Sequence, residues 1–76
     1  MYDIFDYSDL IGKIITKFKS RKVFAEQMHM DYGNLTKKLN GKMYWTTTDI
    51  YKACVLLNID LSEVSRYFFT LKVEQG

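Results

Sequence analysis

Apolar residues recur at three- and four-residue intervals along most of this chain, which is the period of an amphipathic helix. The first such segment begins near residues 6–8, where capping residues are available, and carries apolar side chains to residue 18. Its isoleucines are β-branched, but a strand would need strict alternation, which is missing here. This segment is therefore predicted to be a helix. Its apolar positions are Tyr7, Leu10, Ile11, Ile14, Ile15 and Phe18.

Two shorter helices are predicted next. Ser20 is a suitable N-cap for the second helix, and residues 29–31 interrupt its pattern. Asp31 is in turn a suitable N-cap for a third helix that reaches about Leu39. The dipeptide at 40–41, Asn-Gly, is a strong stop and turn signal. The apolar stripe of the second helix is formed by Phe24, Ala25 and Met28.

Two further helices are predicted from capping sequences. Thr46 with Asp49 three residues later resembles a capping box, with Asp in place of the preferred Glu. Asp60 and Glu63 stand in the same relation before the fifth helix. The apolar stripe is Ile50, Ala53, Cys54 and Leu57 in the fourth helix, and Val64, Tyr67 and Phe68 in the fifth.

The length of the chain predicts a single domain over residues 1–76, and the helical spacing described above predicts that it is all-α. The chain has no proline, so helix can follow helix with few forced breaks. Its 47% hydrophobic residues are enough to fill one small core. The alternation of Leu71 and Val73 allows an extended tail over residues 69–76.

Charge is unevenly distributed along the chain. Residues 1–12 carry three acids and no base, whereas residues 13–42 carry eight bases against two acids. Residues 43–76 carry three bases against four acids. A basic middle suggests a positive face directed at a polyanion, although an ordinary solvated surface would also fit.

The candidate chemistry points away from an enzyme. Cys54 is the one cysteine and His29 the one histidine, so neither a metal site nor Cys/His catalysis is expected. The acids at 3, 6 and 9 suit a helix start. No phosphate-binding glycine loop is present, and we expect no cofactor and no small-molecule substrate. The lone cysteine, the missing signal pattern and the lack of a long apolar run lead us to expect a cytoplasmic protein with no membrane association.

Residues 21–42 have the pattern of two short helices that cross steeply at a tight turn. Ala25 is the small residue needed where the two backbones approach. Met30 can fill the corner between the helices, and Leu35 can anchor the third helix to the core.

This stretch resembles the helix-turn-helix of the Cro/CI-type phage repressors, and it looks closest to short phage-encoded Cro-like regulators. The resemblance covers most of the chain and implies a five-helix lambda-repressor-like domain with its helix-turn-helix at about 21–40. It also implies a transcriptional repressor of phage or prophage origin that binds double-stranded DNA in a bacterial host. The resemblance rests on Phe24-Ala25, Met28, Met30, Leu35-Thr36, 40–42, 45–46 and 58–60, with aromatic residues at 5–7 and 67–69.

Two positions depart from the family pattern. His29 stands where the family usually has glycine, but histidine tolerates a positive φ better than most residues. Lys38 stands where an apolar residue is usual, and Leu39 can anchor the helix in its place because it lies four residues after Leu35.

The wheel of the third helix, residues 31–39, separates an inner from an outer side. Leu35 and Leu39 define the inner side, and the outer side is polar and free of acids. A helix with such a face can read base edges in the major groove, although plain solvent exposure would look the same. For Tyr32, edge packing is an equal alternative. The expected base-reading residues are Tyr32, Gly33, Asn34, Thr36 and Lys37.

Phosphate contacts are expected around this helix, from the start of the second helix and from the residues after the third. The candidates are Ser20, Arg21, Lys22, Lys38, Asn40, Lys42 and Tyr44.

Two questions about partners stay open at this point. The same fold serves in adaptors and antirepressors that bind a protein rather than DNA. A homodimer on operator DNA is also expected, with apolar residues 68–73 as a candidate surface. The alternative is that these residues fold back onto the first helix or onto residues 4–5.

Overall fold

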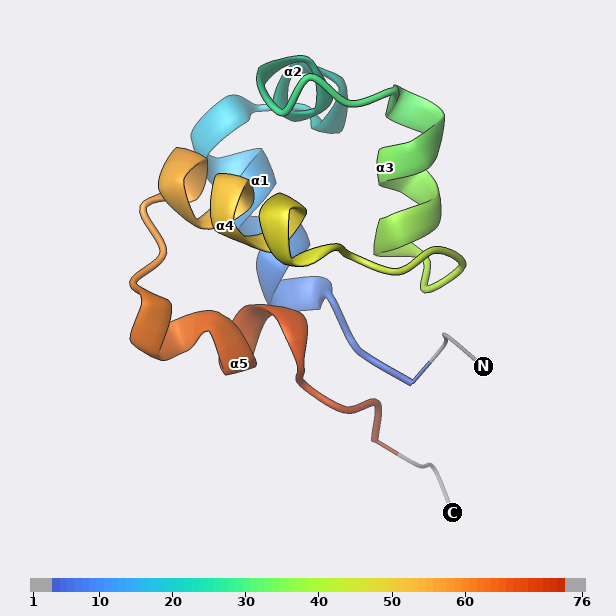
Figure 1. The fold of residues 1–76 in the computed structure, drawn as a ribbon, viewed down its shortest axis with the longest axis vertical. Helices are drawn as coiled ribbons and strands as arrows, with labels where there is room; N and C mark the ends of the chain where they lie inside the picture. The colour runs from blue at the N-terminus through green and yellow to red at the C-terminus, as the bar shows by residue number, and fades with distance from the viewer. Residues whose placement is uncertain (1–3, 74–76) are drawn as a thin grey trace.

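The helices predicted from the sequence are present in the computed structural model, which describes residues 4–73 (Figure 1). The acid at position 3 and residues 74–76 of the expected tail lie outside this range. In chain order the elements are α1 (Ser8–Phe18), α2 (Arg21–Gln27), α3 (Tyr32–Leu39), α4 (Thr47–Leu57), the short 3₁₀ helix η1 (Leu61–Glu63) and α5 (Val64–Phe68).

The caps expected from the sequence form as hydrogen bonds. The Ser20 hydroxyl accepts from the Val23 amide (3.1 Å), and the Asp31 carboxylate accepts from the Asn34 amide (3.2 Å). At α4, Thr46 and Asp49 form the complete reciprocal capping box. These bonds satisfy amides that a helix leaves free in its first turn, which is why α2, α3 and α4 begin where their caps stand, whereas α1 begins after Tyr7 without a side-chain cap.

The fifth helical segment differs in detail from the expectation. The Asp60 side chain accepts from the Ser62 amide (2.9 Å) and starts one 3₁₀ turn, which then continues as α5. Glu63 lies at the junction of the two elements and has no side-chain bond back to the cap in this arrangement. The expected single helix is therefore a short 3₁₀ turn followed by a short α-helix.

The core is built around α1, which contacts α2, α4 and α5. Figure 1 shows α1 behind α4 in the centre of the molecule, with α2 and α3 along one border and α5 along another. The largest fully buried side chains come from the stripes read in the sequence: Phe24, Phe68, Leu10, Ile14, Met28, Leu35 and Leu57. Trp45 is partly buried against the core and packs edge-on against Phe68, with ring centroids 5.1 Å apart.

The tail folds back onto the start of the chain. The Asp6 amide donates to the Thr70 carbonyl (2.7 Å), and the Lys72 amide donates to the Ile4 carbonyl (2.9 Å). These bonds flank an isolated antiparallel bridge between Phe5 and Leu71. Among residues 4–73 this bridge is not extended into a strand. The expected fold-back of this segment onto residues 4–5 is therefore observed, and the dimer surface stays a prediction.

Among residues 4–73, no helix is long and apolar enough to cross a membrane.

Candidate nucleic-acid interface

The helix α3 presents one face to the core and the opposite face to solvent. Leu35 and Leu39 are buried, as the wheel predicted. The exposed residues of the helix and its C-cap, which we call the outward face, are Tyr32, Gly33, Asn34, Lys37 and Asn40. Tyr32 keeps 49% of its surface exposed, which fits edge packing and contact with a base equally.

Thr36 lies at the border of the outward face and is half-buried. Its hydroxyl oxygen is buried and has no hydrogen-bond partner in the structure. The hydroxyl is thus turned away from solvent and cannot donate to a base edge in this rotamer. Any contribution of Thr36 to base reading rests on its methyl group.

The turn between α2 and α3 makes the steep crossing possible. His29 has a positive φ of 56°, so it takes the left-handed conformation expected at this position. Ala25, which is 1% exposed, lies where the two helices meet. The corner is filled by Met30, which is half-buried against the core. The turn thereby projects α3 from one side of the molecule (Figure 1).

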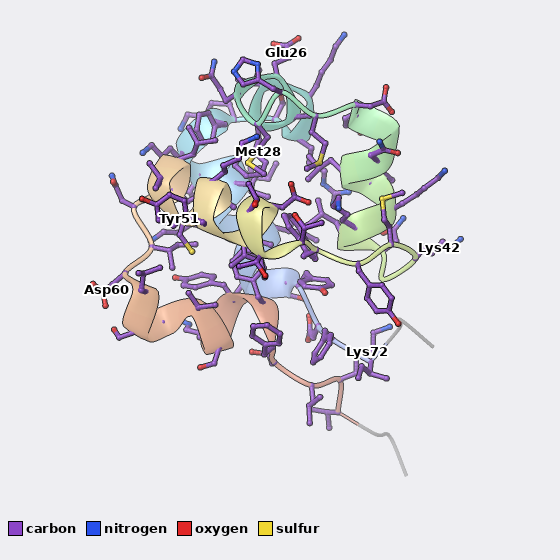
Figure 2. All side chains as sticks on the ribbon, viewed as in Figure 1. Glu26, Met28, Lys42, Tyr51, Asp60 and Lys72 are labelled. Atoms are coloured by element: carbon purple, nitrogen blue, oxygen red, sulfur yellow. The ribbon has the colours of Figure 1, made fainter. Side chains whose placement is uncertain are left out.

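The expected phosphate-contacting residues other than Lys38 come before α2 and after α3 in the chain. Before α2 the Ser20 oxygen is already used as the cap, Arg21 is half-buried and Lys22 is exposed. After α3 the chain turns through Gly41, which has a φ of 76°. Lys42 then extends away from this loop, as Figure 2 shows. Tyr44 follows with 67% of its surface exposed.

Lys38 is placed differently from the expectation that it contacts phosphate. Its side chain is 8% exposed, and its ammonium lies 2.8 Å from the Asp49 carboxylate. The same ammonium donates to the Tyr44 carbonyl (2.7 Å). The departure from the family pattern at this position is therefore a lysine that points inward, and its charge is not available at the surface.

Asp49 is held in its charged form by these contacts. Burial alone would raise its pKa, but hydrogen bonds from Lys38 and Thr46 lower the pKa below the ordinary value of 3.8. The loop that follows α3 is thus tied to the first turn of α4 by a charged pair on the inner side.

The wheel missed an acid at the end of the outward face. The Asp31 side chain caps α3 and lies so close to Gly33 that a Cβ there would be 2.9 Å from its Oδ2. A side chain at position 33 would therefore push the capping carboxylate aside. Glycine at this position keeps the cap and also leaves the backbone open to close approach.

A second surface feature was not foreseen from the sequence. An apolar groove of about 250 Å³ lies beside the loop after α3. It combines the start of the chain, the 43–45 segment, α4 and the 68–69 segment, which are remote in sequence. Its aromatic lining is Phe5, Tyr7, Tyr44, Trp45, Phe68 and Phe69, and its aliphatic lining is Ile4, Met43 and Ile50.

Residues 4–73 contain no group of three His, Cys, Asp or Glu side chains that could hold a metal ion. Cys54 is buried, and burial raises the pKa of its thiol.

Comparison with known protein families places the chain in one of them. The model of the DUF739 family, described as a protein of unknown function, matches residues 3–71. The chain belongs to the DUF739 family. No functionally curated protein matches it.

The fold of this DUF739 protein is shared with a solved phage regulator. It is similar to the solution structure of the modulator of repression (MOR) of the temperate bacteriophage TP901-1 from Lactococcus lactis. The identity is 36%, the match covers 92% of this chain and 95% of that one, and the TM-score is 0.78. The resemblance to short phage regulators is thus confirmed at the level of a phage regulatory protein.

Proposed function

We propose that this protein is a sequence-specific double-stranded DNA-binding regulator of phage or prophage transcription, of the Cro/CI-like repressor kind, that acts in the host cytoplasm. The observation that carries the proposal is the outward face of α3. It offers amide and ammonium groups from Asn34, Lys37 and Asn40 on a helix that projects from one side of the molecule. Lysine can donate to guanine O6 and N7, and asparagine can pair with adenine in the major groove.

Cations on both sides of α3 support the same docking. Arg21 and Lys22 stand at the start of α2, and Lys42 stands in the loop after α3. In helix-turn-helix proteins such flanking groups bind the phosphate backbone and fix the register of the reading helix. Asp31 opposes phosphate at the first turn of α3, so we expect that turn to face bases rather than the backbone.

The test is a mobility-shift titration with duplex DNA over a range of salt concentrations. Each neutralised phosphate contributes about −0.9 to the slope of log affinity against log salt. With about three to five such contacts, affinity should fall more than tenfold between 50 and 200 mM salt. Selection of binding sites from random duplexes would then give the operator sequence. Absence of binding at low salt, or a flat salt response, would overturn the proposal.

A second candidate function is an adaptor or antirepressor that binds a protein. The name of the similar TP901-1 protein, modulator of repression, favours it, because a modulator can act on a repressor instead of on DNA. The apolar groove beside α3 is a suitable anchor site for an apolar side chain of such a partner. An adaptor would show no salt-steep DNA binding, and its partner would be retained on the immobilised protein at salt concentrations that abolish weak electrostatic contacts.

A further inference from the structure

Lys38 occupies an internal position that an apolar residue would fill at lower cost. Its side chain is only 8% exposed, whereas the neighbouring Lys37 on the same helix is exposed to solvent. Burying an ammonium group costs several kcal/mol unless it is paired and hydrogen-bonded. Replacing such a pair by well-packed apolar residues is often neutral or stabilising. Stability alone therefore does not account for a lysine here.

The contacts of the Lys38 ammonium join three segments. It lies 2.8 Å from the Asp49 Oδ2 in the first turn of α4, and it donates to the Tyr44 carbonyl (2.7 Å) in the loop. Asp49 is itself fixed by the Thr46 capping box, in which the Asp49 amide donates to Thr46 Oγ1 (3.0 Å). One ammonium thus connects the last turn of α3, the loop 40–46 and the start of α4.

That loop carries three of the residues expected to meet the DNA backbone, Asn40, Lys42 and Tyr44. Its conformation is also set by the left-handed Gly41, by bonds from the Gly41 amide to the Lys38 carbonyl (3.3 Å) and from the Lys42 amide to the Lys37 carbonyl (2.8 Å), and by a bond from the Thr46 amide to the Asp49 carboxylate (3.4 Å). We propose that Lys38 and Asp49 are positioning residues that hold the loop 40–46 in the register required to contact the DNA backbone, without touching DNA themselves. This inference rests on the proposed DNA-binding function.

The ion pair and hydrogen bond of Lys38 fix the position of the loop 40–46 more specifically than apolar packing at the same place would. Apolar packing would hold α3 against α4, but it would remove the hydrogen bond that Lys38 donates to the Tyr44 carbonyl. The ion pair specifies where the loop runs, and the side chain of Lys42 emerges from that loop (Figure 2).

The sign of the effect of Asp49→Asn separates positioning from direct contact. If Lys38 bound phosphate, removing the acid beside it would leave DNA affinity unchanged or raise it. If the pair positions the loop, Asp49→Asn should lower affinity although the protein becomes more positive. Loss of one phosphate contact corresponds to a decrease of about eightfold in affinity at 0.1 M salt, and lowers the salt slope by about 0.9.

Three further variants complete the test. Glu26→Gln makes the same charge change on the exposed surface of α2 and should bind as tightly as wild type or more tightly. Lys38→Met keeps an apolar chain of similar length and should lose as much affinity as Asp49→Asn. The double variant should lose no more than either single one, because the two residues act through one contact. If Asp49→Asn binds like Glu26→Gln, or if the two losses add, the inference is wrong.

Whether the Lys38–Asp49 pair holds the loop 40–46 can also be measured on the free protein, without DNA. Backbone amide exchange and ¹⁵N relaxation should show faster motion of residues 41–45 in Lys38→Met and in Asp49→Asn than in Glu26→Gln, with the helices intact by circular dichroism. Unchanged dynamics of the loop would mean that the Lys38–Asp49 pair does not hold it, and the inference would be wrong. If the loop loosens as expected but wild-type protein does not bind duplex DNA, the proposed DNA-binding function is wrong. The Lys38–Asp49 pair would then position the loop for a partner other than DNA.

Discussion

The amide of Met30 donates to the carbonyl of Ala25 across 2.9 Å, and this bond closes the turn between α2 and α3. It spans His29, whose φ of 56° lies in the left-handed region. The crossing of the two helices thus depends on a backbone conformation that residues other than glycine rarely adopt.

Replacing His29 with glycine should stabilise the protein. His29 is exposed, so little contact is lost, and glycine takes a positive φ without steric cost. We expect the free energy of unfolding to rise by about 0.5–1 kcal/mol, after allowing for the greater freedom of glycine in the unfolded chain. That corresponds to an increase of about 2–8 °C in Tm for a domain of this size. His29→Ala is the control and should not stabilise, because alanine has the same difficulty with positive φ.

Base reading and phosphate contact can be separated by two lysine variants. Lys37→Ala should cost roughly 1–3 kcal/mol on the preferred duplex and reduce sequence preference. The Lys37 carbonyl that accepts from Lys42 belongs to the backbone, so the loop is left intact. Lys22→Ala should weaken binding about equally on all duplexes and lower the salt slope by roughly one unit. Uniform losses for both variants in a titration on matched and scrambled duplexes would mean that Lys37 does not read bases.

Asp49 should contribute to stability in a defined pH range. Its pKa is lowered in the folded protein, so its contribution is present above the unfolded value of 3.8 and is lost as pH falls through the lower folded pKa. At pH 7, Asp49→Asn should cost about 2–3 kcal/mol, below the range for fully buried pairs because Asp49 is partly exposed. The difference between wild type and variant should stay constant from pH 7 to 5 and shrink below pH 3.8, as measured by urea unfolding.

The matched control for this pH dependence is Asp9→Asn. Asp9 pairs with Arg66 at 3.2 Å, but both side chains are more than half exposed. Such exposed pairs contribute little to stability, so Asp9→Asn should cost much less than Asp49→Asn. A loss at Asp9 as large as that at Asp49 would contradict the role assigned to burial.

On DNA we expect two copies bound to two half-sites about one helical turn apart. The structure narrows the candidate surface, because Phe68 belongs to the core whereas Phe69, Leu71 and Val73 are at least half exposed. A Leu71→Ser/Val73→Ser variant keeps the backbone bridge and should still bind a single half-site. Its apparent affinity for a palindromic duplex should fall by about 100-fold as cooperativity is lost. Sedimentation that finds non-cooperative binding of wild-type protein to that duplex would refute the dimer.

Much of this fold could be predicted because its signals are local. The caps at Ser20, Asp31 and Thr46 are set by side chains within three residues of the amides they bind, and the core stripes follow from helical spacing. The strained turn at His29 could likewise be anticipated from the family pattern. These features depend on neighbours in sequence and so can be read from it.

The parts that could not be predicted depend on residues remote in sequence. Lys38 was expected at the surface because lysine is rarely buried, and its partner Asp49 lies eleven positions further on and is fixed by a cap of its own. The groove is formed by four segments that meet only in the folded chain. The return of residues 70–72 to residues 4–6 was one of two open alternatives, since the apolar tail pattern suits an interface as well as an internal contact.

The pairing of residues 4–6 with residues 70–72 makes the described chain almost a closed ring. Neither end segment can leave the surface without removing hydrogen bonds from the other. Fraying, which usually begins independently at the two ends of a small domain, is here one shared event. Because Ile4 and Phe5 line the apolar groove, opening of this pair would also change the shape of that groove.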